Sequence, residues 1–328
     1  MKIFYVDTVY SLFLGLLLDG DTANNLYIFD MSISKNIVEK FRNTYQFSKI
    51  EYKTKYGKYW KHYKQNKEFD EILKKIKHID EIYLQDHLSH SQYLFNNYNY
   101  PMILLEDGTL NYDIKILEEE LNKKEKLKIN SFFRRVCIEK IPQKYKRFGL
   151  SDKIKKIYLT GTLFIPEVIK DKVEIIDIET KWNLLSIEKK KEILDIFDIN
   201  LEKLENLKNE KEKILLITQP LSEDNIISEE EKIDIYSNLL KGRDIKKIYI
   251  KPHPREKTDY TKAFQNIEVV IIEKEFPIEI FMLLNMEFKK VITLFSTAAL
   301  NFKNKYVVEF IGTKDYKALY DKFGDIKI

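Results

Sequence analysis

The sequence predicts an α/β protein with two doubly wound halves, each built on a parallel sheet. Short β-rich apolar runs alternate with segments of helix length along the chain, a pattern typical of parallel α/β sheets. The 328 residues exceed the size of one ordinary core and suit two domains. Neither half contains a G-x-G-x-x-G or Walker A motif, so side chains and helix N-termini are expected to hold any phosphate.

The first half starts with a strand at Ile3–Val6. The apolar run Val9–Leu18 is far shorter than the roughly 20 residues that span a bilayer, so we expect a buried helix there and no transmembrane anchor. The other elements expected in this half are strands at Leu26–Phe29, Ile50–Tyr52, Glu81–Leu84 and Met102–Leu105, and a helix at Glu118–Lys128. A boundary near Pro142–Ser151 divides the chain into predicted domains of residues 1–150 and 151–328.

The second half repeats the alternation. Its predicted strands are Lys156–Leu159, Val173–Ile176, Ile214–Thr218, Lys246–Ile250, Val269–Ile272, Val291–Leu294 and Tyr306–Phe310. Its predicted helices are Ser186–Phe197, Ser228–Leu240, Ile278–Asn285 and Lys314–Phe323. The stretch from about residue 180 to 213 is rich in Lys and Glu at helical spacing, which indicates an exposed helical insertion.

Composition excludes several classes of protein. Charged residues make up 33% and hydrophobic residues 44%, as in a folded globular protein. The 56 Lys and Arg against 52 Asp and Glu leave a net charge of +4, too balanced for a dedicated nucleic-acid binder. This charge still allows mild attraction to an anionic membrane or sugar nucleotide. Cys137 is the only cysteine, so an intrachain disulfide is excluded, and a cytoplasmic location is expected.

The sequence Lys251-Pro252-His253-Pro254 follows the apolar run Ile248–Ile250. The prolines on both sides of His253 restrict its backbone, so that it can neither continue a helix nor pair in a sheet. Its imidazole is therefore expected to project from a stiff turn at the carboxyl edge of the strand. Ligands bind at that edge of open α/β sheets. A histidine there can titrate near neutrality and donate to a phosphate. The alternative is a rigid loop in which the histidine is merely exposed.

The sequence Glu106-Asp107-Gly108 ends another predicted strand. Gly108 permits a turn that other residues resist. Adjacent carboxylates at a strand end can divide two roles, one acting as a general base and the other orienting or capping. The alternative is an Asp-Gly turn that caps a helix beginning near Asn111.

Two further segments end α/β units in the second half. Ser296 and Thr297 directly follow a strand, and their hydroxyls could face an anion together with helix N-terminal amides; a plain N-cap is the alternative. Pro277 is expected to start a helix with Glu279 in its first turn. The helix dipole is sufficient to explain an acid there, but Glu279 could also accept hydrogen bonds from ribose hydroxyls.

Weaker signals complete the candidate set. Gln85 and His87 follow a first-half strand and could contact an acceptor or sugar, with a helix N-terminus as the favoured alternative. Asp224 is a further base candidate, with a solvated loop acid as the favoured alternative. Asp19-Gly20-Asp21 has the spacing of metal-dependent glycosyltransferases, but it follows a helical run, so no metal site is expected there. Aromatic residues alternate with lysines from Tyr52 to Tyr63, which suits a sugar or a half-buried helical face.

Taken together, these motifs resemble the bacterial sialyltransferases of glycosyltransferase family 52, which modify lipooligosaccharide and capsule. The resemblance is carried by Glu106-Asp107-Gly108, Ser296-Thr297 and His253-Pro254, with further likeness in the segments 217–221 and 251–256. It covers most of the chain, from the first strand to Phe310. Some relatives have a second serine at the position of Thr297, and the hydroxyl is kept.

The resemblance implies a GT-B architecture, in which two Rossmann-like domains face a central cleft. It also implies a CMP-sialic acid donor and inversion at the anomeric carbon, with neither a metal nor another cofactor. His253 would bind the CMP phosphate and assist its departure as a general acid, while Ser296 and Thr297 would hydrogen-bond to that phosphate.

The remaining roles also follow from the resemblance. Glu279 would hold the ribose hydroxyls, and the backbone around Lys251 and Pro254 would lie near the cytosine. Glu106 or Asp107 would deprotonate the hydroxyl of a galactose-terminated acceptor. A homodimer and peripheral contact with the inner face of the cell membrane are further expectations. The alternatives are a GT-B glycosyltransferase with another nucleotide sugar and a catalytically silent sugar-nucleotide-binding protein.

Overall fold

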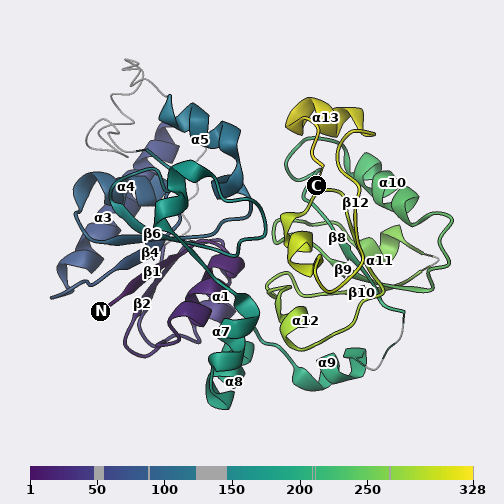
Figure 1. The fold of residues 1–328 in the computed structure, drawn as a ribbon, viewed down its shortest axis with the longest axis horizontal. Helices are drawn as coiled ribbons and strands as arrows, with labels where there is room; N and C mark the ends of the chain where they lie inside the picture. Colours follow the sequence, from purple (N-terminus) through teal and green to yellow (C-terminus); the bar gives the residue numbers. More distant parts are fainter. Residues whose placement is uncertain are drawn as a thin grey trace. The chain divides into compact units, whose positions relative to one another are not determined.

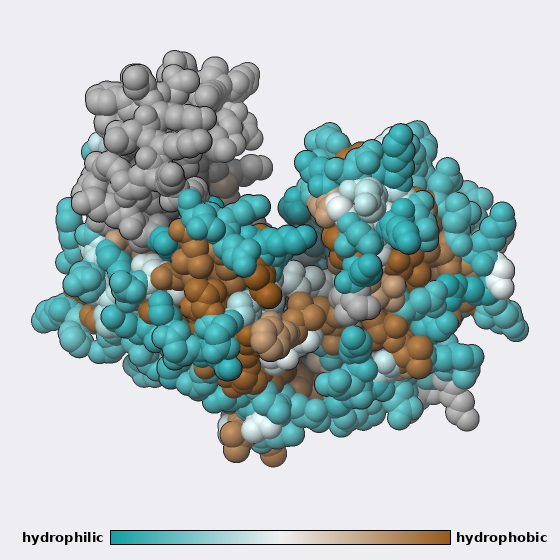
Figure 2. Space-filling model, turned by 45° about the horizontal axis from the view of Figure 1, so that its top comes forward, coloured by the Kyte–Doolittle hydropathy of each residue, from teal (hydrophilic) through white to brown (hydrophobic). Residues whose placement is uncertain are grey.

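A computed structural model describes residues 1–47, 55–87, 89–122, 146–208, 210, 212–265 and 267–327. The chain forms two compact units, Met1–Ile196 and Phe197–Ile328, each with its own parallel sheet (Figure 1). This confirms the predicted α/β class with two Rossmann-like halves. On the face drawn in Figure 2, hydrophilic residues cover most of the surface and hydrophobic areas lie between them.

The first unit contains a seven-stranded parallel sheet in the order β3-β2-β1-β4-β5-β6-β7. Its strands are β1 (Ile3–Val6), β2 (Leu26–Phe29), β3 (Thr44–Gln46), β4 (Ile82–Leu84), β5 (Met102–Leu105), β6 (Ile154–Leu159) and β7 (Val173–Ile175). Its helices are α1 (Val9–Leu18), α2 (Lys35–Val38), α3 (Lys55–Lys74), α4 (Ser89–Asn97), η1 (Leu110–Tyr112), α5 (Ile114–Leu121), η4 (Glu167–Lys172), α7 (Ile178–Leu184) and α8 (Ile187–Ile196).

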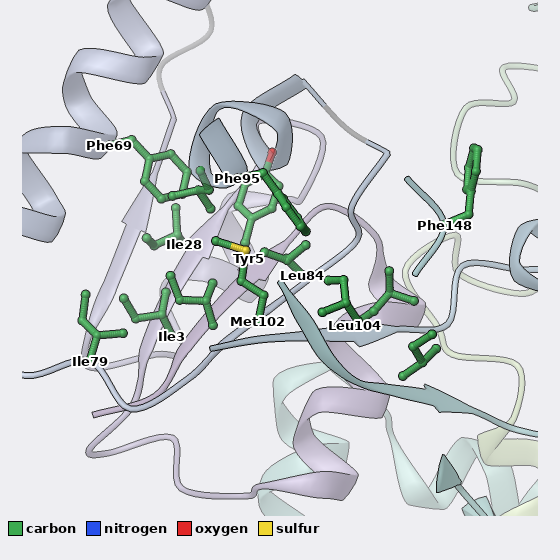
Figure 3. Close-up of a cluster of buried hydrophobic side chains, with 14 of the residues drawn as sticks. Ile3, Tyr5, Ile28, Phe69, Ile79, Leu84, Phe95, Met102, Leu104 and Phe148 are labelled. Atoms are coloured by element: carbon green, nitrogen blue, oxygen red, sulfur yellow. The ribbon is translucent and has the colours of Figure 1, made fainter. Parts of the chain in front are cut away.

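The core of the first unit forms because the central strands are apolar on both faces. Ile3, Tyr5, Leu84, Met102 and Leu104 are all buried and pack together on one face of the sheet (Figure 3). Burying one such side chain stabilises a fold by about 1.5–3 kcal/mol before conformational entropy is counted. The core therefore fixes the positions of the strand ends that follow these residues.

Helix α1 begins where the sequence predicts. Thr8 is its N-cap: the side chain accepts a hydrogen bond from the Ser11 N–H at 3.0 Å, and the Ser11 hydroxyl accepts one from the Thr8 N–H at 3.3 Å. The middle of the helix is buried, as expected for an apolar segment too short to cross a bilayer. No helix among the described residues combines the length and apolar character needed to cross a membrane.

The second unit contains a five-stranded parallel sheet in the order β10-β9-β8-β11-β12. Its strands are β8 (Ile214–Ile217), β9 (Lys247–Lys251), β10 (Glu268–Ile271), β11 (Lys290–Thr293) and β12 (Val308–Phe310). Its helices are α9 (Leu201–Lys208), α10 (Glu229–Leu240), α11 (Tyr260–Ala263), α12 (Ile280–Leu283), η5 (Thr297–Phe302) and α13 (Lys317–Phe323). Its core joins the apolar residues of these strands to α10, α11 and α13.

The structure divides the chain later than the sequence predicts. Strand β6 pairs with β5, and β7 pairs with β6, so residues 151–196 extend the first sheet. The predicted boundary near residue 150 is wrong for this reason. The charged stretch 180–213 is helical in α7, α8 and α9, but it spans the division between the units and is not an insertion within the second domain.

Other differences are local. The third strand lies at Thr44–Gln46. The strand predicted at Ile50–Tyr52 lies entirely outside the described residues, as does Cys137. The helix predicted at Glu118–Lys128 begins earlier, at Ile114, where the Asp113 carboxylate caps it. Residues 123–128 of that prediction also lie outside the described part of the chain.

Candidate active site

The first five strands of the seven-stranded sheet have the same order as the five strands of the other sheet, so the first strand of each unit lies between the second and the fourth. The direction of winding therefore reverses between β1 and β4 in the first unit and between β8 and β11 in the second. Ligands of open α/β sheets bind beyond the carboxyl ends of the strands at such a reversal. The candidate residues follow these and neighbouring strands in both units, and we describe each unit separately.

His253 lies in the turn after β9, and the backbone of that turn orients its ring. The N–H of Arg255 donates to His253 Nδ1 at 3.2 Å. A neutral imidazole that accepts at Nδ1 carries its proton on Nε2, which is then a hydrogen-bond donor. Burial, followed by the positive charges of Arg255 and Lys251, lowers the pKa of His253 to about 4. The prediction that this histidine titrates near neutrality is therefore wrong for the free protein.

Lys251 ends β9 with its side chain buried. Its Nζ donates to the carbonyl of Pro252 at 3.2 Å and to that of Lys274 at 2.9 Å. Burial lowers the pKa of Lys251 to about 8, against the opposing effect of nearby carboxylates led by Glu279. Pro254, two residues beyond Pro252, is exposed. The ammonium thus ties two segments of backbone together beneath the exposed part of the turn.

The paired hydroxyls lie after β11, where η5 begins. Ser296 is the N-cap residue of η5 and is buried, but no side-chain capping hydrogen bond forms there. Its backbone N–H donates instead to Thr293 Oγ1 at 3.0 Å. The structure thus does not support the simple N-cap alternative for Ser296 and Thr297.

Glu279 lies next to η5. Its side chain is buried, and Oε1 accepts a hydrogen bond from Asn301 Nδ2 at 2.9 Å. The predicted helix after Pro277 is shorter than expected: α12 begins at Ile280 and Glu279 is its N-cap residue, with no side-chain capping hydrogen bond. Glu279 therefore lies at the N-terminus of α12, where the helix dipole favours an acid, and its carboxylate makes no capping hydrogen bond, so both interpretations of this residue stay open.

In the first unit, Glu106 and Asp107 differ sharply in environment. Glu106 is buried and accepts hydrogen bonds from the hydroxyls of Tyr10 at 3.0 Å and Tyr112 at 2.7 Å, and from the Thr160 N–H at 2.5 Å. Burial raises its pKa, although these donors oppose the shift. Glu106 therefore ties β5 to η1 and to the end of β6.

Asp107 is accessible, with 29% of its side chain exposed, and its Oδ2 lies 3.2 Å from Nε2 of His87. Although burial disfavours the imidazolium, the hydrogen bond that His87 donates to Asp107 and the charges of nearby carboxylates raise the pKa of His87. Gly108 has φ 56°, the left-handed conformation that the sequence predicts for it. The helix that begins near Asn111 is η1, whose N-cap residue is Thr109 without a side-chain capping hydrogen bond, so the alternative role of Asp107 as its cap is not observed.

Asp7 belongs to the same site but carries no motif that would reveal it. It follows β1, and burial together with the charge of Asp107 raises its pKa to about 7. With its amide nitrogen facing Asp7, Gln85 donates to the two carboxylate oxygens at 2.8 and 2.6 Å. The structure thus gathers Asp7, Gln85, His87 and Asp107 at the reversal point of the first sheet. The segment that holds Gln85 and His87 also precedes α4, which agrees with the helix N-terminus that the sequence suggests there.

Asp86 holds the backbone of Phe148, whose ring stacks on His87. Its buried carboxylate accepts hydrogen bonds from the N–H groups of Phe148 at 2.8 Å and Gly149 at 2.7 Å, and burial raises its pKa to about 6. Phe148 is held at φ 59°, which an aromatic residue rarely adopts, and its ring stacks on that of His87 at a centroid distance of 6.0 Å.

Asp224 lies in the second unit, in the loop after β8. It forms an ion pair with Arg255, and its negative charge opposes the lowering of the His253 pKa. Asp224 is exposed, as expected for the solvated loop acid that the sequence favours. Its pairing with Arg255 also brings it close to the turn formed by Lys251-Pro252-His253-Pro254, here called the KPHP turn. Glu256, which the sequence marks only through its likeness to the family, is also part of this turn: its carboxylate accepts the His253 N–H at 2.6 Å.

The described residues include no group of three or more His, Cys, Asp or Glu side chains that could hold a metal ion. Asp19, the first acid of the D-x-D spacing, instead pairs with Lys2, whose Nζ lies 2.7 Å from its Oδ2.

Three solved structures have a similar fold. An α/β-galactoside α-2,3-sialyltransferase of Photobacterium phosphoreum matches with a TM-score of 0.59 at 13% identity, over 98% of this chain and 93% of that one. A 2,6-sialyltransferase of a Photobacterium species, in a ternary complex with CMP and lactose, matches with a TM-score of 0.60 at 15% identity, over 98% and 75%. UDP-GlcNAc 2-epimerase of Neisseria meningitidis matches with a TM-score of 0.53 at 10% identity, over 100% and 95%. At these identities the likeness shows the fold alone, and that fold is GT-B.

Sequence comparison is more specific. An uncharacterized protein of Haemophilus influenzae is 39% identical over 258 residues, which cover 78% of this chain and 76% of that protein. The model of glycosyltransferase family 52 matches residues 22–314. This match includes Glu106, Asp107, His253, Glu279 and Ser296 and extends over most of both units. The chain therefore belongs to glycosyltransferase family 52.

Proposed function

We propose that the chain is an inverting sialyltransferase that transfers sialic acid from CMP-sialic acid to a galactose-terminated glycan of lipooligosaccharide, capsule or a similar acceptor. Membership of a glycosyltransferase family supports glycosyl transfer. The observation that carries the proposal is the arrangement in the second unit, where a neutral His253, the hydroxyls of Ser296 and Thr297, and the buried Glu279 follow the carboxyl edge of one sheet.

His253 is proposed to stabilise the departing CMP through its Nε2–H. At pH 7 the imidazole of the free protein is neutral, because its pKa is about 4. The second pKa of a phosphate monoester is about 6, so CMP leaves as a weak base that needs no proton at pH 7. One preorganised donor aimed at developing charge is typically worth about 2.7–4 kcal/mol. Proton transfer from His253 requires that bound phosphate first raise the pKa of the imidazole.

Asp107 is proposed as the general base. Its carboxylate is accessible and contacts His87, whereas Glu106 is buried among three donor residues. Asp107 would take the proton of the acceptor hydroxyl as the hydroxyl oxygen forms a bond to the anomeric carbon and the bond to the CMP phosphate breaks. A general base typically contributes ~10²–10⁴-fold. Asp224 remains the alternative base, although its pairing with Arg255 makes it less available.

Calorimetric titration with CMP and with UDP, followed by assay of nucleotide release, tests the proposal. We expect CMP to bind more tightly than UDP, and CMP to be released from CMP-sialic acid when lactose is added. Release should persist in EDTA, because the proposed reaction uses no metal. Preferred binding of UDP with turnover of a UDP-sugar would show another GT-B glycosyltransferase. CMP binding without release on any galactoside would show a silent binding protein.

A surface on α3 supports the predicted contact with the membrane. Trp60 is 54% exposed and stacks on Tyr63 at 5.3 Å, and the ammonium groups of Lys64 and Lys67 lie over these rings at 5.7 and 4.8 Å. Trp and Tyr favour the interface of a bilayer, and lysines favour anionic headgroups. Cosedimentation with anionic but not with neutral vesicles, weakened by Trp60→Ala, would support this contact. Homodimerisation and the cytoplasmic location stay predictions.

A further inference from the structure

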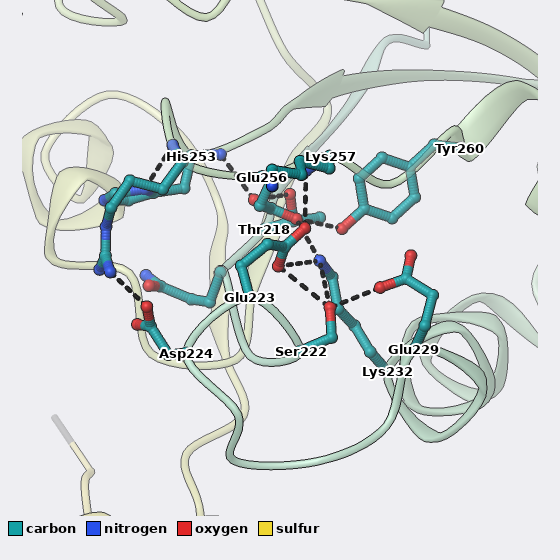
Figure 4. A network of polar contacts seen from close by, with 12 residues as sticks. Thr218, Ser222, Glu223, Asp224, Glu229, Lys232, His253, Glu256, Lys257 and Tyr260 are labelled. Atoms are coloured by element: carbon teal, nitrogen blue, oxygen red, sulfur yellow. Dashed lines mark hydrogen bonds and ion pairs between the residues drawn. The ribbon is translucent and has the colours of Figure 1, made fainter. Parts of the chain in front are cut away.

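One buried carboxylate, that of Glu256, holds the backbone of the KPHP turn. Its Oε1 accepts hydrogen bonds from the His253 N–H at 2.6 Å and from Thr218 Oγ1 at 2.7 Å. Its Oε2 accepts one from the hydroxyl of Tyr260 and lies 3.1 Å from Nζ of Lys232 (Figure 4). Glu256 thus links the end of β8, the turn after β9 and the first residue of α11.

The negative charge of Glu256 is balanced by the ammonium group of a buried lysine, Lys232. Lys232 on α10 is fully buried, and its Nζ lies 2.8 Å from Oε2 of Glu223 as well as close to Glu256. Burial would raise the pKa of Glu223, but hydrogen bonds from Lys232 and from the Lys257 N–H lower it to about 2. Two carboxylates therefore share one buried ammonium group (Figure 4).

Stability alone does not account for this arrangement. Removing charges from water costs several kcal/mol per ion, and well-packed apolar residues stabilise a core at least as well as a buried ion pair. The carboxylate of an ion pair can, however, accept hydrogen bonds from backbone N–H and hydroxyl groups in one fixed geometry. That geometry is lost when one partner of the pair is removed. Here the backbone it fixes is the N–H of His253.

We infer that Glu256, held by Lys232 and Thr218, is a positioning residue that fixes the imidazole of His253 so that its Nε2–H points toward the leaving phosphate. The inference rests on the proposed function for the identity of that phosphate. Two contacts fix the position and orientation of the His253 ring. Glu256 accepts a hydrogen bond from the backbone N–H of His253, and the Arg255 N–H donates to Nδ1 of the ring. Glu256 therefore acts through His253 and needs no contact with the substrate.

The variant Glu256→Gln tests this role, because it keeps the shape of the side chain and removes its charge. The amide would face the donors Tyr260, Thr218 and Lys232 with an NH₂ group or leave them unpaired, so the turn should loosen. Misplacement of a catalytic group by about 1 Å can cost about 10²-fold. We expect kcat for CMP release to fall by about that factor, with a smaller change in KM for CMP-sialic acid.

A second readout separates positioning from a loss of the proposed activity. NMR titration of the histidine ring resonances reports the tautomer and pKa of His253 without turnover, and the chain has only five histidines. In Glu256→Gln the pKa of His253 should rise from about 4 toward its ordinary value, because burial is the largest cause of its low value and the gain of solvent outweighs the loss of the negative charge of Glu256, which alone would lower the pKa. This result would support the inference even if the protein proved inactive with CMP-sialic acid.

Two further variants guard against simple misfolding. Thr218→Val removes one hydroxyl bonded to Glu256 and should shift kcat and the His253 pKa in the same directions by smaller amounts. Glu309→Gln is the control, because it breaks an ion pair with Arg243 at the β12 edge of the same unit. It should lower the melting temperature and leave both readouts unchanged. An unaltered kcat and an unaltered His253 pKa in Glu256→Gln and Thr218→Val would overturn the inference, as would equal effects in Glu309→Gln.

Discussion

Nε2 of His87 lies 3.2 Å from Oδ2 of Asp107, beyond the carboxyl ends of two neighbouring strands of the first sheet. Both side chains are partly accessible, whereas the adjacent Glu106 is buried and saturated with donors. Of the two acids in the Glu106-Asp107-Gly108 motif, this contrast supports Asp107 as the proposed base. It also connects the proposed base to His87, whose ring stacks on Phe148, and the backbone of Phe148 is held by Asp86.

Replacement of Asp107 should affect the reaction, whereas replacement of Glu106 should affect the fold. Asp107→Asn should lower kcat by ~10²–10⁴-fold with an unchanged melting temperature, because only the base is lost. Glu106→Gln should instead destabilise the protein by roughly 1–3 kcal/mol, because a buried amide cannot satisfy the donors that surround it. Steady-state kinetics and thermal unfolding of both variants check this, and the reverse pattern would contradict the assignment of Asp107.

Asp7 should make the stability of the protein depend on pH. Its folded-state pKa of about 7 lies above that of an unfolded aspartate, so the folded state binds the extra proton between these values. The stabilising contribution is present at pH below about 4 and is lost as the pH rises through 7. Asp7→Asn should therefore unfold at a higher temperature than the unsubstituted protein at pH 8, with little difference near pH 4. An equal difference at both values would contradict the raised pKa.

CMP should change the ionisation of His253. In the free protein burial and neighbouring cations hold the pKa near 4, and a phosphate placed at Nε2 adds an opposing negative charge. The pKa, followed by NMR of the ring, should rise when CMP is added and should not respond to cytidine. If CMP bound without moving this pKa, the phosphate would not lie beside His253.

Glu279 should matter for donor binding more than for the chemical step. Glu279→Ala removes the proposed partner of the ribose hydroxyls and should raise KM for CMP-sialic acid roughly tenfold or more, with a smaller effect on kcat. Asn301→Ala provides the matched control, because it removes the side chain that holds Glu279 but keeps the carboxylate. Its effect should be smaller. A fall in kcat with KM unchanged would place Glu279 in the chemical step instead.

Much of the fold could be predicted because a strand buried on both faces is a continuous apolar run. Ile3–Val6 and Met102–Leu105 match the observed strands residue for residue. Thr44–Gln46 could not be predicted in this way, since a short edge strand with polar residues has no such run. The domain boundary failed for a different reason: β6 resembles the first strand of a new domain, and only its pairing with β5 assigns it to the first sheet.

The candidate site was predictable where adjacent residues form a motif. Glu106-Asp107, His253-Pro254 and Ser296-Thr297 each follow a strand, and the motif alone marks them. Asp7 and Glu256 are single carboxylates whose importance comes from partners distant in sequence, namely Gln85 for Asp7 and the buried Lys232 for Glu256. The ionisation state of His253 could not be predicted from the sequence either, since its low pKa depends on burial that no local sequence pattern reveals.

The central claim is that this chain transfers sialic acid and that His253 stabilises the departing CMP. Incubation with CMP-sialic acid and lactose, followed by mass spectrometry of the glycan product, tests it most directly. The account predicts sialylated lactose with the unsubstituted protein and a yield lower by ~10²–10³-fold with His253→Ala, the range observed when one preorganised donor is removed. Absence of product across a panel of galactose-terminated acceptors, or full activity of His253→Ala, would contradict it.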